Sequence, residues 1–141
     1  MSLNKVFGIA GSAMAAQSTR LNTTASNLAN ADSASGDASK VYRARQPVFQ
    51  SVPDFGAALD NESANFGVRV RSIVESQAPL TQRYQPQHPE ADENGNVYVS
   101  NVNTVEEMVN MLSASRSYQS SVEIMTTTRD LLAQTLRMGE S

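Results

Sequence analysis

The feature that most constrains this chain is a heptad spacing of apolar residues near both of its ends. Over residues 3–30, mostly apolar side chains recur at alternating intervals of four and three. This spacing predicts an α-helix with a narrow apolar seam, the pattern that lets helices wind around one another. The seam positions are Leu3, Phe7, Ala10, Met14, Gln17, Leu21, Thr24 and Leu28.

The carboxyl-terminal part repeats this spacing and predicts a second helix over residues 104–138. Asn103 or Thr104 can cap it, with an acid three residues later as in a capping box. Such a helix would be roughly 50 Å long at 1.5 Å per residue, too long for a small middle module to cover. We therefore expect the two helices to pair with each other and with other subunits. The seam positions are Met111, Ser115, Tyr118, Val122, Met125, Arg129, Leu132 and Leu136, and Met108 is interpreted as an adaptable seam residue.

The two helices differ in charge. Over residues 1–30 only Lys5 and Arg20 are charged, whereas average usage is about one charged residue in four. This favours a first helix enclosed by neighbours in an assembly, the alternative being a weak helix on a small domain. The second helix carries seven charges, so we expect one of its faces to meet water or a polar partner.

The middle of the chain has a different period. Residues 31–40 form a loop rich in helix breakers, and residues 66–75 alternate as a strand does. Residues 41–52 are a second candidate strand, which Pro47 either confines to an edge or splits. Asn94-Gly95 predicts a tight turn into a strand at 97–99, and three prolines make 79–93 an extended segment. The fold class is therefore α+β, with helical segments 1–32 and 101–141 around a β-rich module, 33–100.

The sequence offers no constellation for catalysis or cofactor binding. There is no Cys and His88 is the only His, which we interpret as a loop residue. The acidic turn at 92–96 lacks the Gly and Glu spacing of a calcium loop. We expect no enzyme activity, no cofactor, no metal site and no small-molecule substrate. A net charge of -3 argues against nucleic acid as a partner.

The chain has no apolar run approaching the roughly 20 residues of a membrane span. Its first residues lack the dense apolar core and cleavage site of a secretory signal, and the helical pattern runs through them. We therefore expect the first residues to be mature structure, and any export to occur without a cleaved signal peptide.

Several motifs resemble those of one bacterial family. Residues 15–22 and 25–32 are similar to the amino-terminal signature of flagellar rod and hook proteins, in which a Ser-Asn-Leu-Ala-Asn run closes the first helix. Here that run is 26–30, so the resemblance adds Asn27 and Asn30 to the expected assembly residues. Residues 42–45 resemble the segment that follows it. Residues 88–95, 101–108 and 113–118 resemble the proximal rod members of the family.

The resemblance implies a structural subunit of the proximal rod, the drive shaft that crosses the periplasm, transmits torque and encloses the export channel. It implies that the terminal helices pair as an antiparallel coiled coil, with the middle module further out. The implied partners are copies of itself, other rod proteins, the protein at the junction of membrane ring and rod, and the flagellar type III export apparatus. The alternative that remains is a soluble coiled-coil adaptor or secretion chaperone, against which the low charge of the first helix argues.

Overall fold

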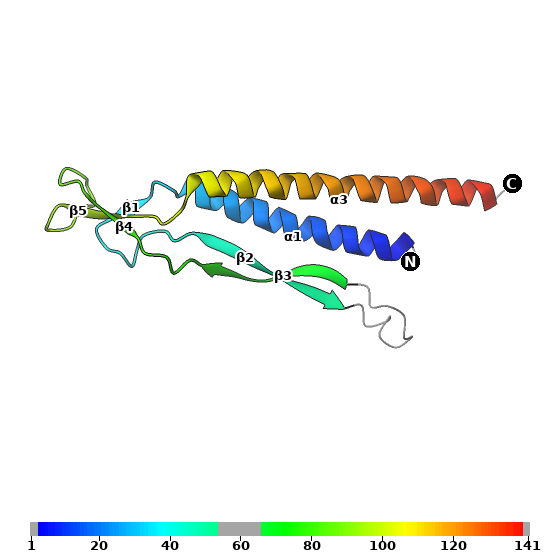
Figure 1. Cartoon of the computed structure of the whole chain (residues 1–141), viewed down its shortest axis with the longest axis horizontal. Helices are drawn as coiled ribbons and strands as arrows, with labels where there is room; N and C mark the ends of the chain where they lie inside the picture. Colours follow the sequence, from blue (N-terminus) through cyan, green and yellow to red (C-terminus); the bar gives the residue numbers. More distant parts are fainter. Residues whose placement is uncertain (1–2, 54–65, 140–141) are drawn as a thin grey trace. The chain divides into compact units, whose positions relative to one another are not determined.

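Two long helices occupy the ends of the chain in the computed structural model, which describes residues 3–53 and 66–139 (Figure 1). Helix α1 spans Leu3–Ala29 and helix α3 spans Thr104–Gly139. The helices expected at 3–30 and 104–138 are thereby confirmed.

Asparagine side chains form hydrogen bonds at the carboxyl-terminal end of α1 and at the amino-terminal end of α3. Asn103 Oδ1 accepts hydrogen bonds from the N–H groups of Val105 (3.1 Å) and Glu106 (3.4 Å), so Asn103 rather than Thr104 is the cap of α3. At the end of α1, Asn30 Nδ2 donates to the Ser26 carbonyl at 2.8 Å, and the Asn30 N–H donates to the same carbonyl at 3.2 Å.

A three-stranded antiparallel sheet forms part of the middle of the chain. Its strands are β1 (Ala34–Ser35), β5 (Asn96–Val99) and β4 (Thr81–Tyr84), in the order β1-β5-β4. Val97 and Val99 on the central strand β5 are buried, whereas the edge strand β4 is exposed throughout. The predicted strand at 97–99 is confirmed, while β4 lies within the stretch that we expected only to be extended.

A tight turn leads into β5. Gly95 has a φ of 76°, a conformation that favours glycine, and its N–H donates to the Asp92 carbonyl at 2.9 Å. Asp92 Oδ1 accepts from the N–H groups of Asn94 and Asn96, which uses this carboxylate oxygen to hold the turn.

The second sheet has two strands, β2 (Arg45–Pro53) and β3 (Phe66–Glu75). The Ser76 N–H donates to the Ala44 carbonyl at 2.7 Å, and Arg45 forms a 3.0 Å ion pair with Glu75. The start of β2 therefore lies beside the end of β3, and the pair is antiparallel. Pro47 is tolerated in β2 because each strand of a two-stranded sheet has a free edge.

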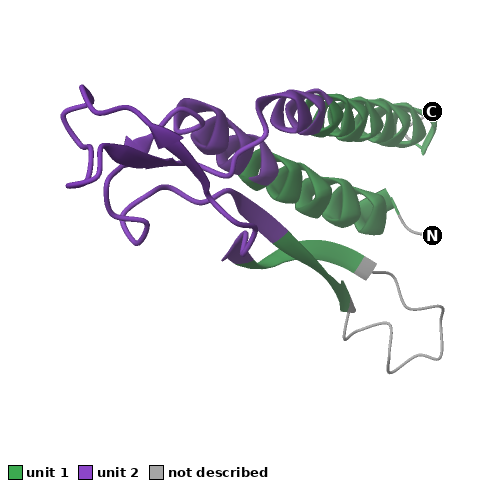
Figure 2. Cartoon of the chain, turned by 60° about the vertical axis from the view of Figure 1, so that its left-hand side comes forward, with its two compact units in different colours: residues 1–19, 48–72, 113–141 green, residues 20–47, 73–112 purple. Residues whose placement is uncertain are grey.

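The chain divides into two compact units, shown in green and purple in Figure 2. Unit 1 contains residues 1–19, 48–72 and 113–141, and unit 2 contains 20–47 and 73–112. The buried apolar residues in both units are small: Ala10, Ala16 and Ala114 in unit 1, and Ala31, Val41, Ala44, Val97 and Val99 in unit 2. Cores of this kind bury little apolar surface, which is the main source of stability for a folded chain.

Candidate assembly surfaces

Helix α3 has a seam of buried and partly buried residues whose spacing along the sequence alternates strictly between four and three. Four of its positions are buried, and the four positions that alternate with them are partly buried. The buried positions are Glu107, Ala114, Ser121 and Thr128, and the partly buried ones are Met111, Tyr118, Met125 and Leu132. The seam thus combines small or polar residues with large ones, as interdigitated helix packing requires.

The hydroxyl groups of Ser121 and Thr128 on this seam are paired within the helix itself. Ser121 Oγ donates to the Ser117 carbonyl at 3.0 Å, and Thr128 Oγ1 donates to the Ile124 carbonyl at 2.7 Å. Such bonds to the preceding turn satisfy a hydroxyl that has left water. The polar seam positions are therefore compatible with burial.

The structure differs from the expected seam at every second position. Met111, Tyr118, Met125 and Leu132 are common to both. The expected Ser115, Val122 and Arg129 lie one residue beyond the buried Ala114, Ser121 and Thr128, and the expected Leu136 lies beyond the last buried position. Val122, Arg129 and Leu136 are exposed. The reason is that Ala, Ser and Thr allow the closest approach to a neighbouring backbone, while apolar character alone had favoured Val122 and Leu136.

Helix α1 is more uniformly enclosed. Ala10, Ala16, Thr23, Thr24 and Asn27 are buried, and most other positions are partly buried. Its exposed positions form one stripe without charge: Asn4, Gly8, Ala15, Ser18, Asn22, Ala25 and Ala29. We call these residues the α1 stripe. At Gly8 an added Cβ would meet no atom within 4 Å, so the stripe is open there.

Within unit 1, β3 is held against α1 by Ser12. Its Oγ donates to the Ile9 carbonyl at 2.8 Å and accepts from the Val68 N–H at 3.1 Å. The neighbouring Gly67 permits this approach, because a Cβ there would lie 3.1 Å from Ser12 Oγ.

Within unit 2, Asn27 joins α1 to the start of β2. Its side chain is buried at 1% exposure. Asn27 Nδ2 donates to the Arg45 carbonyl at 2.8 Å, and Oδ1 accepts from the Arg45 N–H and from the Tyr42 hydroxyl, each at 2.9 Å. The Arg45 guanidinium lies 5.3 Å from the centre of the Tyr42 ring, a cation–π contact. One carboxamide thereby pairs both backbone groups of a strand residue.

Asn101 has the corresponding role before α3. Its Oδ1 accepts from the Ala44 N–H at 2.8 Å, and its Nδ2 donates to the Ala78 carbonyl at 3.0 Å. Arg43 Nη1 donates to the same Ala78 carbonyl at 3.1 Å. Asn27 and Asn101 thus hold neighbouring residues, Arg45 and Ala44, where the chain enters β2. Asn101 was part of the resemblance but was not predicted as a site residue, since hydropathy gives no signal for it.

The residues expected at an assembly interface lie in three kinds of environment. Ala10 and Asn27 are buried. Met108, Val122 and Leu136 are exposed. The remaining ones are partly buried: Leu3, Phe7, Met14, Leu21, Leu28, Asn30, Met111, Tyr118, Met125 and Leu132.

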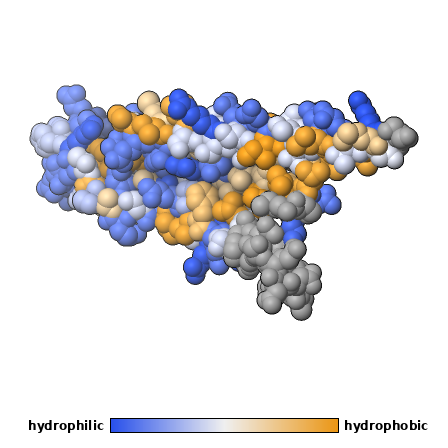
Figure 3. Space-filling model, turned by 45° about the vertical axis from the view of Figure 1, so that its right-hand side comes forward, coloured by the Kyte–Doolittle hydropathy of each residue, from blue (hydrophilic) through white to orange (hydrophobic). Residues whose placement is uncertain are grey.

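Exposed apolar side chains on α3 were largely missed by the heptad pattern. Val105, Val109, Leu112, Ile124 and Leu131 are each about half exposed or more. Figure 3 shows hydrophobic atoms, in orange, lying among hydrophilic ones at the surface. Exposed apolar groups of this size are typical of surfaces that bind another chain.

No group of three or more His, Cys, Asp or Glu in the described part of the chain could hold a metal ion. His88 Nδ1 accepts the Glu90 N–H at 3.1 Å, a local role within its loop. Among the described residues, no helix is both long and apolar enough to cross a membrane.

Long helices with a regular seam, small cores and exposed apolar side chains on α3 are typical of a structural protein that works by assembly. Two family models match its ends: "Flagella basal body rod protein" over residues 7–36, and "Flagellar basal body rod FlgEFG protein C-terminal" over residues 93–138.

Similar proteins match along the whole chain. The flagellar basal-body rod protein FlgC of Salmonella typhimurium is 50% identical over 99% of this chain and 100% of its own length. FlgC of Escherichia coli O157:H7 is 49% identical and FlgC of Buchnera aphidicola from Acyrthosiphon pisum is 41% identical, with the same coverage.

The chain therefore belongs to the FlgC family of flagellar basal-body rod proteins. It is a structural subunit of the flagellar rod, not an enzyme, and it assembles with other rod components.

Proposed function

We propose that this rod subunit polymerises into the proximal part of the shaft that crosses the periplasm, where it transmits torque and encloses the export channel. In this proposal segments 1–32 and 101–141 form the axial core as an antiparallel coiled coil. The module 33–100 lies further from the axis.

The course of the two helices supports their pairing. Helix α1 begins in unit 1 and ends in unit 2, while α3 begins in unit 2 and ends in unit 1. In unit 2, Arg20 Nη2 donates to Asn110 Oδ1 at 3.0 Å, which links the two helices directly. The alternation of four and three on α3 is the spacing of a coiled coil.

The small buried cores support the proposal that the stability of the subunit depends on neighbouring subunits in the rod. Ala114 and Val97 are each 0% exposed, but they contribute few carbon atoms compared with Leu or Phe. A domain with little buried apolar surface gains stability when partners cover its exposed groups. We propose that the predicted interface residues of both helices are enclosed in this way in the rod.

We also propose that the chain is exported by the flagellar type III apparatus without cleavage, and that it contacts the protein joining the membrane ring to the rod. The continuity of α1 from Leu3, with Ala10 and Ala16 buried, supports retention of the first residues. The mass of the chain from purified basal bodies tests this. A chain lacking its first 15 to 30 residues, as a cleaved signal would leave it, contradicts uncleaved export.

The observation that carries the proposal is the buried seam of α3, and Ala114→Asp tests it. An unpaired charge at this fully buried position prevents helix packing, so we expect normal expression and export but no rods and no motility. The matched control is Ser113→Asp at the exposed neighbouring position. Normal swimming of Ala114→Asp cells would contradict the role of this seam.

A further inference from the structure

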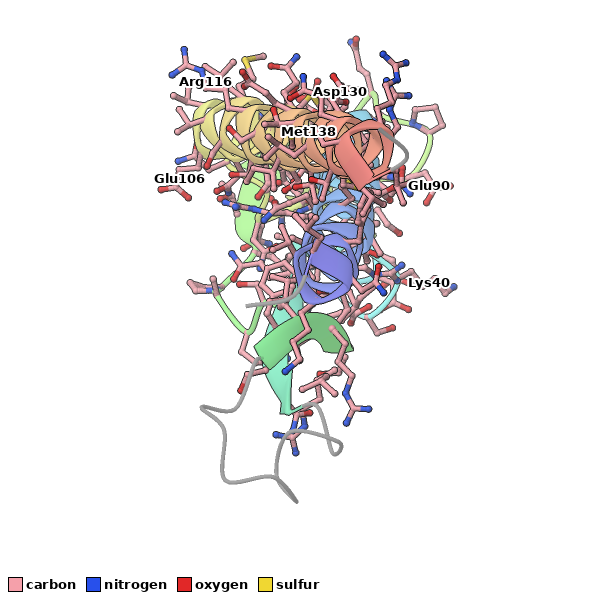
Figure 4. The ribbon with its side chains drawn as sticks, turned by 90° about the vertical axis from the view of Figure 1, so that its right-hand side faces the viewer. Lys40, Glu90, Glu106, Arg116, Asp130 and Met138 are labelled. Carbon is pink, nitrogen blue, oxygen red and sulfur yellow. The ribbon has the colours of Figure 1, made fainter. Side chains whose placement is uncertain are left out.

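The chain contains a single Asn-Gly pair, Asn94-Gly95, in the turn that leads into β5. Asn-Gly is the dipeptide most prone to deamidation, because no side chain on the glycine shields its backbone nitrogen. The Asn94 side chain is exposed. Figure 4 shows Glu90, which precedes this turn and is also exposed, projecting away from the ribbon. Water therefore reaches this loop.

Deamidation of an Asn-Gly pair begins within the backbone. The Gly95 nitrogen gives up its proton and forms a bond to Cγ of Asn94, while the Cγ–Nδ2 bond breaks and ammonia leaves. Water then opens the resulting succinimide ring at either carbonyl carbon. The product is Asp, or isoAsp with an extra backbone carbon, and each is negatively charged and about 1 Da heavier than Asn.

The attacking nitrogen is held in a hydrogen bond in this structure. The Gly95 N–H donates to the Asp92 carbonyl at 2.9 Å, which closes a β-turn with Asp in its first position and Gly in its last. The succinimide nitrogen carries no hydrogen, so this bond is lost when the ring forms. The turn must therefore open before Asn94 can react.

Further hydrogen bonds hold the peptide groups on both sides of Gly95. Asp92 Oδ1 accepts from the N–H groups of Asn94 at 2.9 Å and Asn96 at 2.7 Å. The Asp92 N–H donates to the Asn96 carbonyl at 2.9 Å, and the Gln85 N–H donates to the Gly95 carbonyl at 2.8 Å. These bonds restrain the Asn94–Gly95 peptide against the rotation that would bring its nitrogen to Cγ.

Neighbouring side chains also restrict the movement of Gly95. A Cβ at this position would lie 3.0 Å from the Cβ of Pro86 and 3.1 Å from the Cε2 of Tyr84. Gly95 is thus packed against the segment that follows β4, and movement in that direction is blocked.

A modified Asn94 would affect the centre of the three-stranded sheet. Strand β5 is the central strand, and its Val97 is 0% exposed. The extra backbone carbon of isoAsp changes the path of the chain into β5 and moves Asn96 out of reach of its bonds with Asp92. The turn therefore protects a position at which this chemical change is structurally costly.

We propose that Asn94 is the deamidation site of this chain, and that the turn built on Asp92 sets the rate by keeping the Gly95 nitrogen in its hydrogen bond. In the closed turn Asn94 reacts slowly, and opening of the turn releases the reaction. The proposal is independent of the proposed function, because it depends only on residues of the loop before β5.

Incubation of the purified full chain in mildly alkaline buffer, with and without guanidinium chloride, tests the protection. Mass spectrometry of peptides that contain Asn94 measures the conversion, and their isoAsp content identifies the succinimide route. We expect the native chain to react at least about tenfold more slowly, because several hydrogen bonds must open together. Equal rates, or faster deamidation of another asparagine in the denatured chain, overturn the proposal.

Substitution of Asp92 tests the role of its side chain. Asp92→Ala removes the Oδ1 acceptor, and we expect Asn94 to react at least about fivefold faster in native buffer. Asp92→Asn keeps a side-chain oxygen in this place and should retain most of the protection. The matched control is Glu93→Ala, because Glu93 is exposed and its side chain is not part of these bonds.

Circular dichroism shows whether Asp92→Ala keeps the native fold. A native spectrum with an unchanged rate of deamidation overturns the proposal. If the variant unfolds, hydrogen exchange of the Gly95 amide in the wild-type chain supplies the second measurement. Exchange and deamidation both require the Gly95 N–H to leave the Asp92 carbonyl, so we expect the fold to slow both reactions by a similar factor. A Gly95 amide that exchanges as fast as in the denatured chain overturns the proposal.

Discussion

The carboxamide of Asn27 pairs with both the N–H and the carbonyl of Arg45, at 2.9 and 2.8 Å. The Asn27 side chain, near the end of α1, thus makes the two hydrogen bonds with Arg45 that the backbone of a neighbouring strand would otherwise make. We expect Asn27→Ala to lower the free energy of unfolding by about 2 to 3 kcal/mol, because buried polar groups lose their partners. Denaturant unfolding of the purified chain measures this. Asn22→Ala, on the exposed side of α1, is the control and should be neutral or slightly stabilising.

The ion pair between Arg45 and Glu75 should contribute much less. Both side chains are about half exposed, at 48% and 50%, although the atoms are 3.0 Å apart. We expect Glu75→Gln to cost less than about 1 kcal/mol. The difference from the wild-type chain should shrink in 1 M salt, because the Debye length there is about 3 Å. A loss as large as that of Asn27→Ala would contradict this ranking.

Gly36 should be intolerant of any side chain. A Cβ at this position would lie 2.6 Å from the Glu90 carbonyl oxygen and 3.1 Å from the Asp92 nitrogen, both backbone atoms. We expect Gly36→Ala to destabilise the chain by about 1 to 3 kcal/mol, because the two segments must move apart. Thermal unfolding followed by circular dichroism measures the change, and an unchanged melting temperature would disprove the close approach.

Gly8 should behave in the opposite way in the isolated chain. It lies in the interior of α1 with open space around the added Cβ. Gly8→Ala should therefore favour the helix by about 0.5 to 1 kcal/mol and raise the helical content of the purified chain. If the α1 stripe is closely packed in the rod, the same substitution lowers motility. Gain of helix with normal motility would mean that this end of the stripe has room for a methyl group.

A substitution at Leu132 tests the α3 seam at a position that the heptad pattern predicted and that the structure also places on the seam. It is partly buried on α3, about seven turns beyond Glu107, where the seam starts. Leu132→Asp should block rod assembly without reducing expression, because the seam would enclose an unpaired charge. Electron microscopy of basal bodies and a swimming assay measure this, with Ala133→Asp at an exposed position as the control. Rods of normal length would contradict the prediction.

The sequence predicted the periodicity of the helices better than their buried faces. The heptad pattern identifies large residues such as Met111 and Tyr118, and both lie on the seam in the structure. Ala114 and Ser121 do not, since small residues occur on any face of a helix. Their burial follows from close packing against another element, which no local pattern records.

The middle of the chain was predictable where turn chemistry is strong. Asn94-Gly95 indicated the turn that Gly95 forms with its positive φ. Strand β4 was missed because nearby prolines concealed a short strand at the edge of its sheet, where it pairs with β5. The role of Asn101 depends on partners at Ala44 and Ala78, each more than 20 residues away, so it could not be read from spacing.

The internally paired hydroxyls of Ser121 and Thr128 have a consequence for what can pack against the α3 seam. Each hydroxyl keeps its hydrogen bond to the preceding turn whether water or another helix lies beside it. Neither hydroxyl therefore needs a polar partner on the element that packs against the seam. The buried face of α3 can consequently be closed by small apolar side chains and backbone alone, with no matching set of donors and acceptors opposite these two residues.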